Sequence, residues 1–68
     1  MTRKQLHSLA EVKAWMNQFI GQQFTTQTER MGEPATRSWE TFRANGVPVL
    51  EIEKGSHVKL PMVFALMP

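Results

Sequence analysis

The 68-residue chain contains no cysteine, no tyrosine and no aspartate. Without cysteine it has neither a disulfide bond nor a thiolate ligand for a structural zinc ion. The two histidines are far apart in the sequence, and all acidic residues are glutamates. We therefore expect no metal and no cofactor. A reducing, cytoplasmic environment fits a small chain without disulfides.

Long hydrophobic runs are also missing. The longest apolar stretch, residues 60–67, contains a proline and is much shorter than the roughly 18 apolar residues of a membrane span. No apolar run follows the basic pair Arg3-Lys4, so neither a signal peptide nor a membrane segment is expected. The sequence has no phosphate-binding glycine loop, no nucleophile motif and no zinc-ligand spacing. These absences predict a protein that is not an enzyme.

Charge is sparse and spread along the chain. Eight lysines and arginines against six glutamates give a net charge of +2. A nucleic-acid-binding surface normally gathers its basic residues on one face or helix, and here only Arg3-Lys4 forms a local cluster. The candidate nucleic-acid contacts are Arg3, Lys4, Arg37, Arg43, Lys54 and Lys59.

The hydrophobic spacing predicts one helix over residues 8–20. Ser8 and Glu11 have the spacing of a capping box, in which the two side chains satisfy unpaired N–H groups at a helix start. Gly21 is suited to a C-terminal cap. Apolar residues recur every three or four positions, as on one face of an amphipathic helix. They are Leu9, Val12, Trp15, Met16, Phe19 and Ile20.

Antiparallel strands are expected after this helix. Residues 22–31 are rich in threonine and show no helical period, which favours a strand. Asn45-Gly46 between apolar segments is a strong hairpin signal, because both residues tolerate positive φ. This turn predicts paired strands over residues 36–44 and 47–53.

A second turn at residues 54–56 would lead into the last strand. Together the two turns predict that Trp39 lies opposite Ile52 and that Phe42 lies opposite Val49. Pro48 cannot donate a ladder hydrogen bond, so we expect weak pairing or a bulge there. The predicted core lies between the helix and one face of the sheet. It consists of Val12, Trp15, Phe19, Trp39, Leu50, Ile52, Val58 and Leu60.

A helix over residues 36–44 is the alternative. The segment 37–49 resembles the recognition helix and wing of excisionase-type winged helix-turn-helix proteins, and the chain would then be a small winged helix-turn-helix domain. Ser38, Trp39 and Phe42 favour a strand over a helix. The predicted class is therefore α+β, with one N-terminal amphipathic helix on a three- or four-stranded antiparallel meander. We expect a single domain over residues 1–68.

Polar residues of the predicted turns and strands suggest chemistry only weakly. His57 follows a serine and has a side chain suited to general base catalysis, but we interpret it as a turn residue paired with Glu53. Glu40 and Glu51 would be neighbours, and without aspartate we interpret them as a solvated charged face rather than a metal site. No catalytic residue, cofactor ligand or metal ligand is assigned.

Apolar residues left outside the expected core form the candidate protein interface. In the predicted register they lie on the sheet face without the helix and in the C-terminal tail. Exposed apolar groups of this extent typically mark a protein interface. They are Phe42, Val47, Val49, Pro61, Val63, Phe64 and Leu66.

Two functions from different classes are expected of such a chain. The first is a small accessory protein that binds another protein as an inhibitor, adaptor or regulator, comparable with phage and plasmid anti-defence proteins. It would form a homodimer through the exposed sheet face and the tail. The second is a small basic DNA- or RNA-binding regulatory module. Salt distinguishes them, because phosphate contacts weaken steeply with salt.

Overall fold

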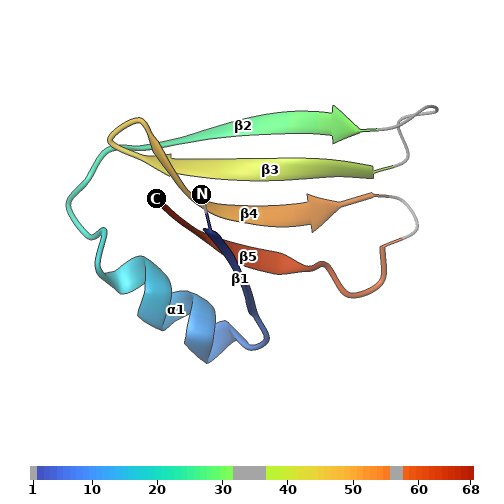
Figure 1. The fold of residues 1–68 in the computed structure, drawn as a ribbon, viewed down its shortest axis with the longest axis horizontal. Coiled ribbons are helices and arrows are strands. Elements are labelled where there is room, and N and C mark those ends of the chain that lie inside the picture. The colour runs from blue at the N-terminus through green and yellow to red at the C-terminus, as the bar shows by residue number, and fades with distance from the viewer. Residues whose placement is uncertain (1, 32–36, 56–57) are drawn as a thin grey trace.

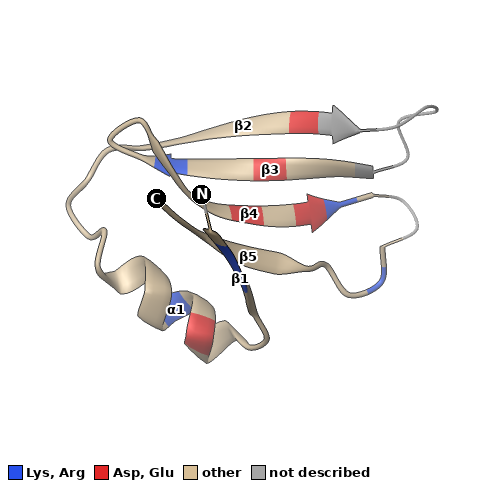
Figure 2. Cartoon of the chain, in the orientation of Figure 1, with Lys and Arg blue, Asp and Glu red and all other residues tan. Residues whose placement is uncertain are grey.

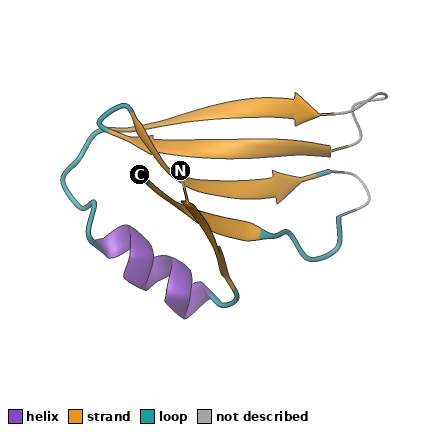
Figure 3. Ribbon diagram, viewed as in Figure 1, coloured by secondary structure: helices purple, strands orange, loops and turns teal. Residues whose placement is uncertain are grey.

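A computed structural model describes residues 2–31, 37–55 and 58–68. Over these residues the chain forms one helix and a five-stranded antiparallel sheet, an α+β arrangement (Figure 1, Figure 3). No helix in this part of the chain is long and apolar enough to cross a membrane. The elements in chain order are β1 (Thr2–Leu6), α1 (Leu9–Asn17), β2 (Phe24–Met31), β3 (Arg37–Ala44), β4 (Val47–Lys54) and β5 (Val63–Met67).

The strands lie in the order β1-β5-β4-β3-β2. Strands β2 to β5 form a meander, and β1 is added at its end by pairing with the C-terminal strand β5. Thr2 lies opposite Met67, and Leu6 lies opposite Val63. The expected meander after an N-terminal helix is therefore only loosely matched, because a strand precedes the helix and completes the sheet. The chain then passes through α1 from one edge of the sheet to the other (Figure 1).

The start of α1 agrees with the sequence prediction. The Ser8 hydroxyl accepts a hydrogen bond from the Glu11 N–H at 3.2 Å. The Glu11 carboxylate accepts in turn from the His7 N–H, also at 3.2 Å. The helix ends at Asn17, earlier than predicted. Gly21, in the turn that follows, has a positive φ of 89°.

The Asn45-Gly46 turn forms as predicted. Both residues have positive φ, 48° and 81°, and Ala44 pairs with Val47 across the turn. Residues 37–44 are a strand, so the winged-helix alternative is wrong. Thr36, the first residue of the predicted strand, lies outside the described residues.

A β-bulge in β4 shifts the predicted pairing by one residue. Arg43 lies opposite Pro48, whereas Phe42 lies opposite Leu50, so Val49 is an extra residue on the bulged strand. Because Pro48 has no N–H, pairing is interrupted most easily beside it. A bulge near Pro48 was expected, but its effect on the register was not.

Beyond the bulge, each residue of β3 shares its face of the sheet with a different residue of β4 than predicted. Side chains alternate along a strand, so a shift of one residue moves each of them to the other face. Trp39 lies opposite Glu53 instead of Ile52. Trp39 is buried, but it lies on the sheet face away from α1, where its ring contacts that of Phe64 at 5.8 Å between centroids.

The hydrophobic core lies between α1 and the other face of the sheet. Its buried residues are Leu6, Ala44, Val49, Leu50 and Ala65, and the side chains packed against them are Val12, Trp15, Met16, Phe19, Phe42, Ile52 and Val63. Three residues of the predicted core are outside it, and Trp39, on the other face of the sheet, is one of them. Leu60 is 88% exposed, and Val58 lies in the loop before β5. The strand next to β4 is β5, not the segment that follows the 54–56 turn.

Candidate protein-binding groove

Helix α1 is only partly packed on the sheet. None of its residues is buried, and Leu9 is 68% exposed. The Trp15 indole Nε1 donates a hydrogen bond of 2.7 Å to the main-chain carbonyl of Val49. The Trp15 ring also meets Phe19 edge-on, with 5.5 Å between centroids. These contacts fix the tryptophan, while surface on either side of the helix stays open.

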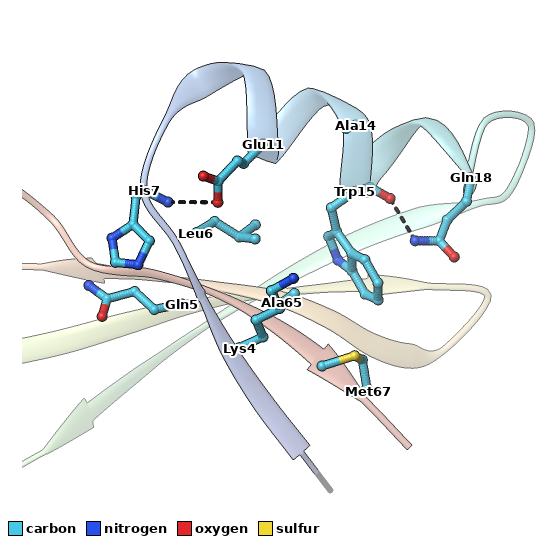
Figure 4. Close-up of a pocket in the computed structure, with 10 residues that line it drawn as sticks. All are labelled: Lys4, Gln5, Leu6, His7, Glu11, Ala14, Trp15, Gln18, Ala65 and Met67. Atoms are coloured by element: carbon cyan, nitrogen blue, oxygen red, sulfur yellow. Dashed lines mark hydrogen bonds between the residues drawn. The ribbon is translucent and has the colours of Figure 1, made fainter.

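A groove of 780 Å³ lies between α1 and β1, which we call the α1–β1 groove (Figure 4). Apolar side chains from three elements form its inner surface: Leu6 of β1, Trp15 of α1, and Ala65 and Met67 of β5. Its other lining residues are Lys4, Gln5, His7, Glu11, Ala14 and Gln18.

The apolar part of the groove contains one side chain held in place, Trp15, and one flexible side chain, Met67. Trp15 is held by its hydrogen bond to β4 and presents an aromatic surface. Met67 projects toward the same space from β5 (Figure 4). A large aromatic ring supplies contact area at low entropic cost, and methionine adapts its shape to what it meets. The arrangement suits the insertion of an apolar side chain from another molecule.

The rim of the groove is polar and carries both charge signs. Lys4 is exposed on β1, and Glu11 lines the groove from α1. Glu11 is held by the His7 N–H, and the Gln18 amide donates to the Trp15 carbonyl at 2.8 Å (Figure 4). An apolar centre with a polar rim is the usual anatomy of a protein interface or a ligand site.

The residues of the predicted interface do not form one exposed sheet face. Val49 and Leu66 are buried, at 4% and 5% exposure. Phe42 packs against the core, and Phe64 packs against Trp39. The reason is β5, which is inserted between β4 and β1 instead of remaining a free tail.

Several residues of that predicted set lie instead in two smaller grooves beside α1. Val47, Val49 and Leu66 line a groove of 380 Å³ next to Trp15 and Phe19. A second groove, of 320 Å³, borders the other end of the helix. It is lined by Leu6, His7, Ser8, Leu9, Val12, Ile52, Pro61 and Val63.

The candidate nucleic-acid contacts are scattered over the fold, and two of them are paired with carboxylates (Figure 2). Arg3 forms an ion pair with Glu51, and its guanidinium lies over the Phe64 ring at 4.1 Å from the centroid. Lys54 forms an ion pair with Glu40 at 2.9 Å. Pairing of this kind lowers the positive potential that a phosphate would meet.

The other basic candidates lie on separate elements. Lys4 is on β1 and Lys59 is in the loop before β5, both exposed. Arg43 of β3 is half-buried, and its Nε atom is buried without a hydrogen-bond partner. The side chain of Arg37 lies outside the described residues. The described part of the chain therefore shows no continuous basic surface.

The polar residues weighed for chemistry are also separated. His57 lies outside the described residues, so its pairing with Glu53 stays a prediction. Glu53 is buried, and its carboxylate accepts a hydrogen bond from the Met62 N–H at 3.4 Å. The Lys54 ammonium and the Thr28 hydroxyl hold the pKa of Glu40 below its ordinary value. Within residues 2–31, 37–55 and 58–68, no three histidine or acidic side chains are grouped as metal ligands would be.

Comparison of the chain with known protein families, with curated proteins and with solved structures finds no match. The α1–β1 groove was not predicted from the sequence, because it depends on β1. Of its lining residues, the sequence singled out Lys4, Glu11 and Trp15, each for another role. The one sequence feature that could have indicated β1 is Leu6, an apolar residue just before the capping box. The other residues of this short strand are polar.

Proposed function

We propose that this chain is a small non-catalytic protein that binds another protein, as an inhibitor, adaptor or regulator, and that it binds through the α1–β1 groove. The observation that carries the proposal is the open apolar surface of Trp15 and Met67 inside a polar rim. The groove volume of 780 Å³ lies within the range of about 300–1,000 Å³ typical of ligand sites. The partner's contribution is an exposed peptide segment with one large apolar side chain.

The distribution of charge supports a protein partner over a nucleic acid. Arg3 and Lys54 each contact a glutamate. Around the groove, Lys4 and Glu11 give a rim of mixed sign, which suits the backbone and polar side chains of a peptide. A polyanion would meet Glu11 at the groove and Glu51 beside Arg3, so both positions would oppose its binding.

Selection from a displayed library of random peptides on the immobilised full chain tests the proposal. Selected peptides should contain a large apolar residue, and Ala14→Arg should weaken them about tenfold or more by placing a long charged side chain in the groove. Asn17→Arg is the control, since it adds the same side chain at an exposed helix position that lines none of the three grooves.

Salt dependence completes this test. Binding of the selected peptide should change little between about 50 and about 200 mM salt, whereas phosphate contacts would lose affinity steeply. The proposal fails if no peptide distinguishes Ala14→Arg from Asn17→Arg. It also fails if labelled duplex DNA or single-stranded RNA binds at low salt and competes with every selected peptide.

A further inference from the structure

Strand β2 forms the sheet edge opposite β1, and its outward backbone groups can be assigned from one contact with the hairpin turn (Figure 1). The Asn45 N–H donates to the Gln23 carbonyl at 2.8 Å, and the Gln23 N–H donates to the Asn45 Oδ1 at 2.9 Å. Backbone groups of successive residues alternate in direction along an antiparallel strand. Thr25 and Gln27 therefore bond to β3 like Gln23, whereas Phe24, Thr26, Thr28 and Arg30 direct their N–H and C=O groups away from the sheet.

This edge lacks the usual protection against pairing. Residues 24–29 are all exposed, and β2 contains neither proline nor lysine; its two charged residues, Glu29 and Arg30, lie near its C-terminal end. Natural edge strands are commonly blocked by such residues or by a covering element. The opposite edge, β1, carries Arg3 and Lys4 and has α1 beside it. The two edges of the sheet thus differ, and β2 is the one open to strand addition.

We infer that β2 pairs antiparallel with β2 of a second copy of this chain, around a two-fold axis at Gln27. In this register Thr26 lies opposite Thr28 of the second copy, and the outward N–H and C=O groups of the two residues bond to each other. Thr25 lies opposite Glu29 of the second copy, and Gln27 lies opposite its own copy. A two-fold axis perpendicular to the sheet joins the two sheets into one and keeps each face continuous.

The side chains of β2 complement their own copies. Threonine pairs across antiparallel strands are favourable, and a glutamine amide both donates and accepts. The Thr28 hydroxyl donates to Glu40 within the chain at 3.1 Å, so its proton already has a partner when the Thr26–Thr28 pairs form. The two Glu29 side chains lie toward opposite ends of the paired strands, so no like charges face each other. These features favour a second copy over an unrelated strand.

Proline at position 26 gives a selective test. The Thr26 N–H points outward, so Thr26→Pro removes a bond to the second copy while the pairing of β2 with β3 keeps its hydrogen bonds. Thr26→Val is the matched control, because it keeps the N–H and the β-branched shape. In sedimentation equilibrium, the full chain and Thr26→Val should approach twice the monomer mass of 7.8 kDa as concentration rises. Thr26→Pro should raise the dissociation constant about tenfold or more.

Amide hydrogen exchange on the unmodified chain gives a readout that does not depend on how Thr26→Pro folds. The amides of Thr26 and Thr28 should be protected at high protein concentration and should exchange rapidly at low concentration. The Gln27 amide should be protected at both. A chain that stays monomeric at millimolar concentration overturns the inference, and so does a dimer in which Thr26 and Thr28 exchange rapidly. The α1–β1 groove lies at the other edge, so neither result bears on the proposed peptide binding.

Discussion

The indole N–H of Trp15 donates a 2.7 Å hydrogen bond to the carbonyl of Val49, the extra residue of the β4 bulge. A bulged residue is left without a regular partner in the ladder. The helix thus supplies a hydrogen bond at the point where the sheet is interrupted. This one contact both anchors α1 to the sheet and fixes an apolar wall of the α1–β1 groove.

Trp15→Phe removes this hydrogen bond and keeps an aromatic ring. The part-buried Val49 carbonyl would lose its partner, and the free energy of unfolding should fall by about 1–2 kcal/mol. Trp39→Phe is the control, because the Trp39 ring packs against Phe64 on the sheet face away from α1. Urea denaturation of both variants measures the difference. A loss for Trp15→Phe well below about 1 kcal/mol would contradict the role assigned to this hydrogen bond.

Two leucines expected in the core have opposite environments. Leu50 is 3% exposed and Leu60 is 88% exposed. Leu50→Ala should cost about 2–5 kcal/mol, since it removes buried methyl groups and leaves a cavity. Leu60→Ala should change stability by less than about 0.5 kcal/mol. Thermal denaturation distinguishes them, and a large effect of Leu60→Ala would show that Leu60 belongs to the core.

Glu40 should make stability depend on pH. Its pKa lies below the ordinary value of 4.5, because Lys54 and then the Thr28 hydroxyl stabilise the carboxylate. A lowered pKa in the folded state gives stabilisation that is fully present above the unfolded value and is lost as pH falls through the folded value. The stability advantage of the parent chain over Glu40→Gln should therefore shrink below pH 4.5.

Urea midpoints at low ionic strength measure this advantage, because Lys54 is 58% exposed and salt screens the pair. Thr28→Val serves as the companion variant. It removes one hydrogen bond to the carboxylate and leaves the Lys54 ion pair, so its pH dependence should lie between those of the parent and of Glu40→Gln. An advantage that stays constant or grows as pH falls would contradict the role assigned to Glu40.

Local signals in the sequence were sufficient for the elements that depend on neighbouring residues. The Ser8–Glu11 capping box locates the start of α1, and Asn45-Gly46 locates the hairpin, because both rest on contacts a few residues apart. The α+β class follows from these elements. The register of β3 with β4 did not follow from the sequence. One extra residue at Val49 shifts every pair beyond it by one position and so changes which residues share a face of the sheet.

The strands that the sequence did not predict form by pairing between segments that are far apart in the chain. The short polar segment Thr2–Leu6 has no strand pattern of its own and becomes β1 only by pairing with β5, at the other end of the chain. The segment Val63–Met67, read as an exposed tail, is the partner of both β4 and β1. Because the α1–β1 groove needs β1 and β5 side by side, its residues could not be assembled from local spacing.

The two tryptophans offer the most direct test of the proposed binding surface. Trp15 lines the α1–β1 groove, and Trp39 lies on the other face of the sheet beside Phe64. Titration of the isotope-labelled full chain with a peptide selected on it can be followed by the two indole N–H signals in an NMR spectrum. We expect the Trp15 signal to shift or broaden and the Trp39 signal to stay in place. Movement of Trp39 with Trp15 unchanged, or saturating binding that moves neither, would contradict the α1–β1 groove as the binding surface.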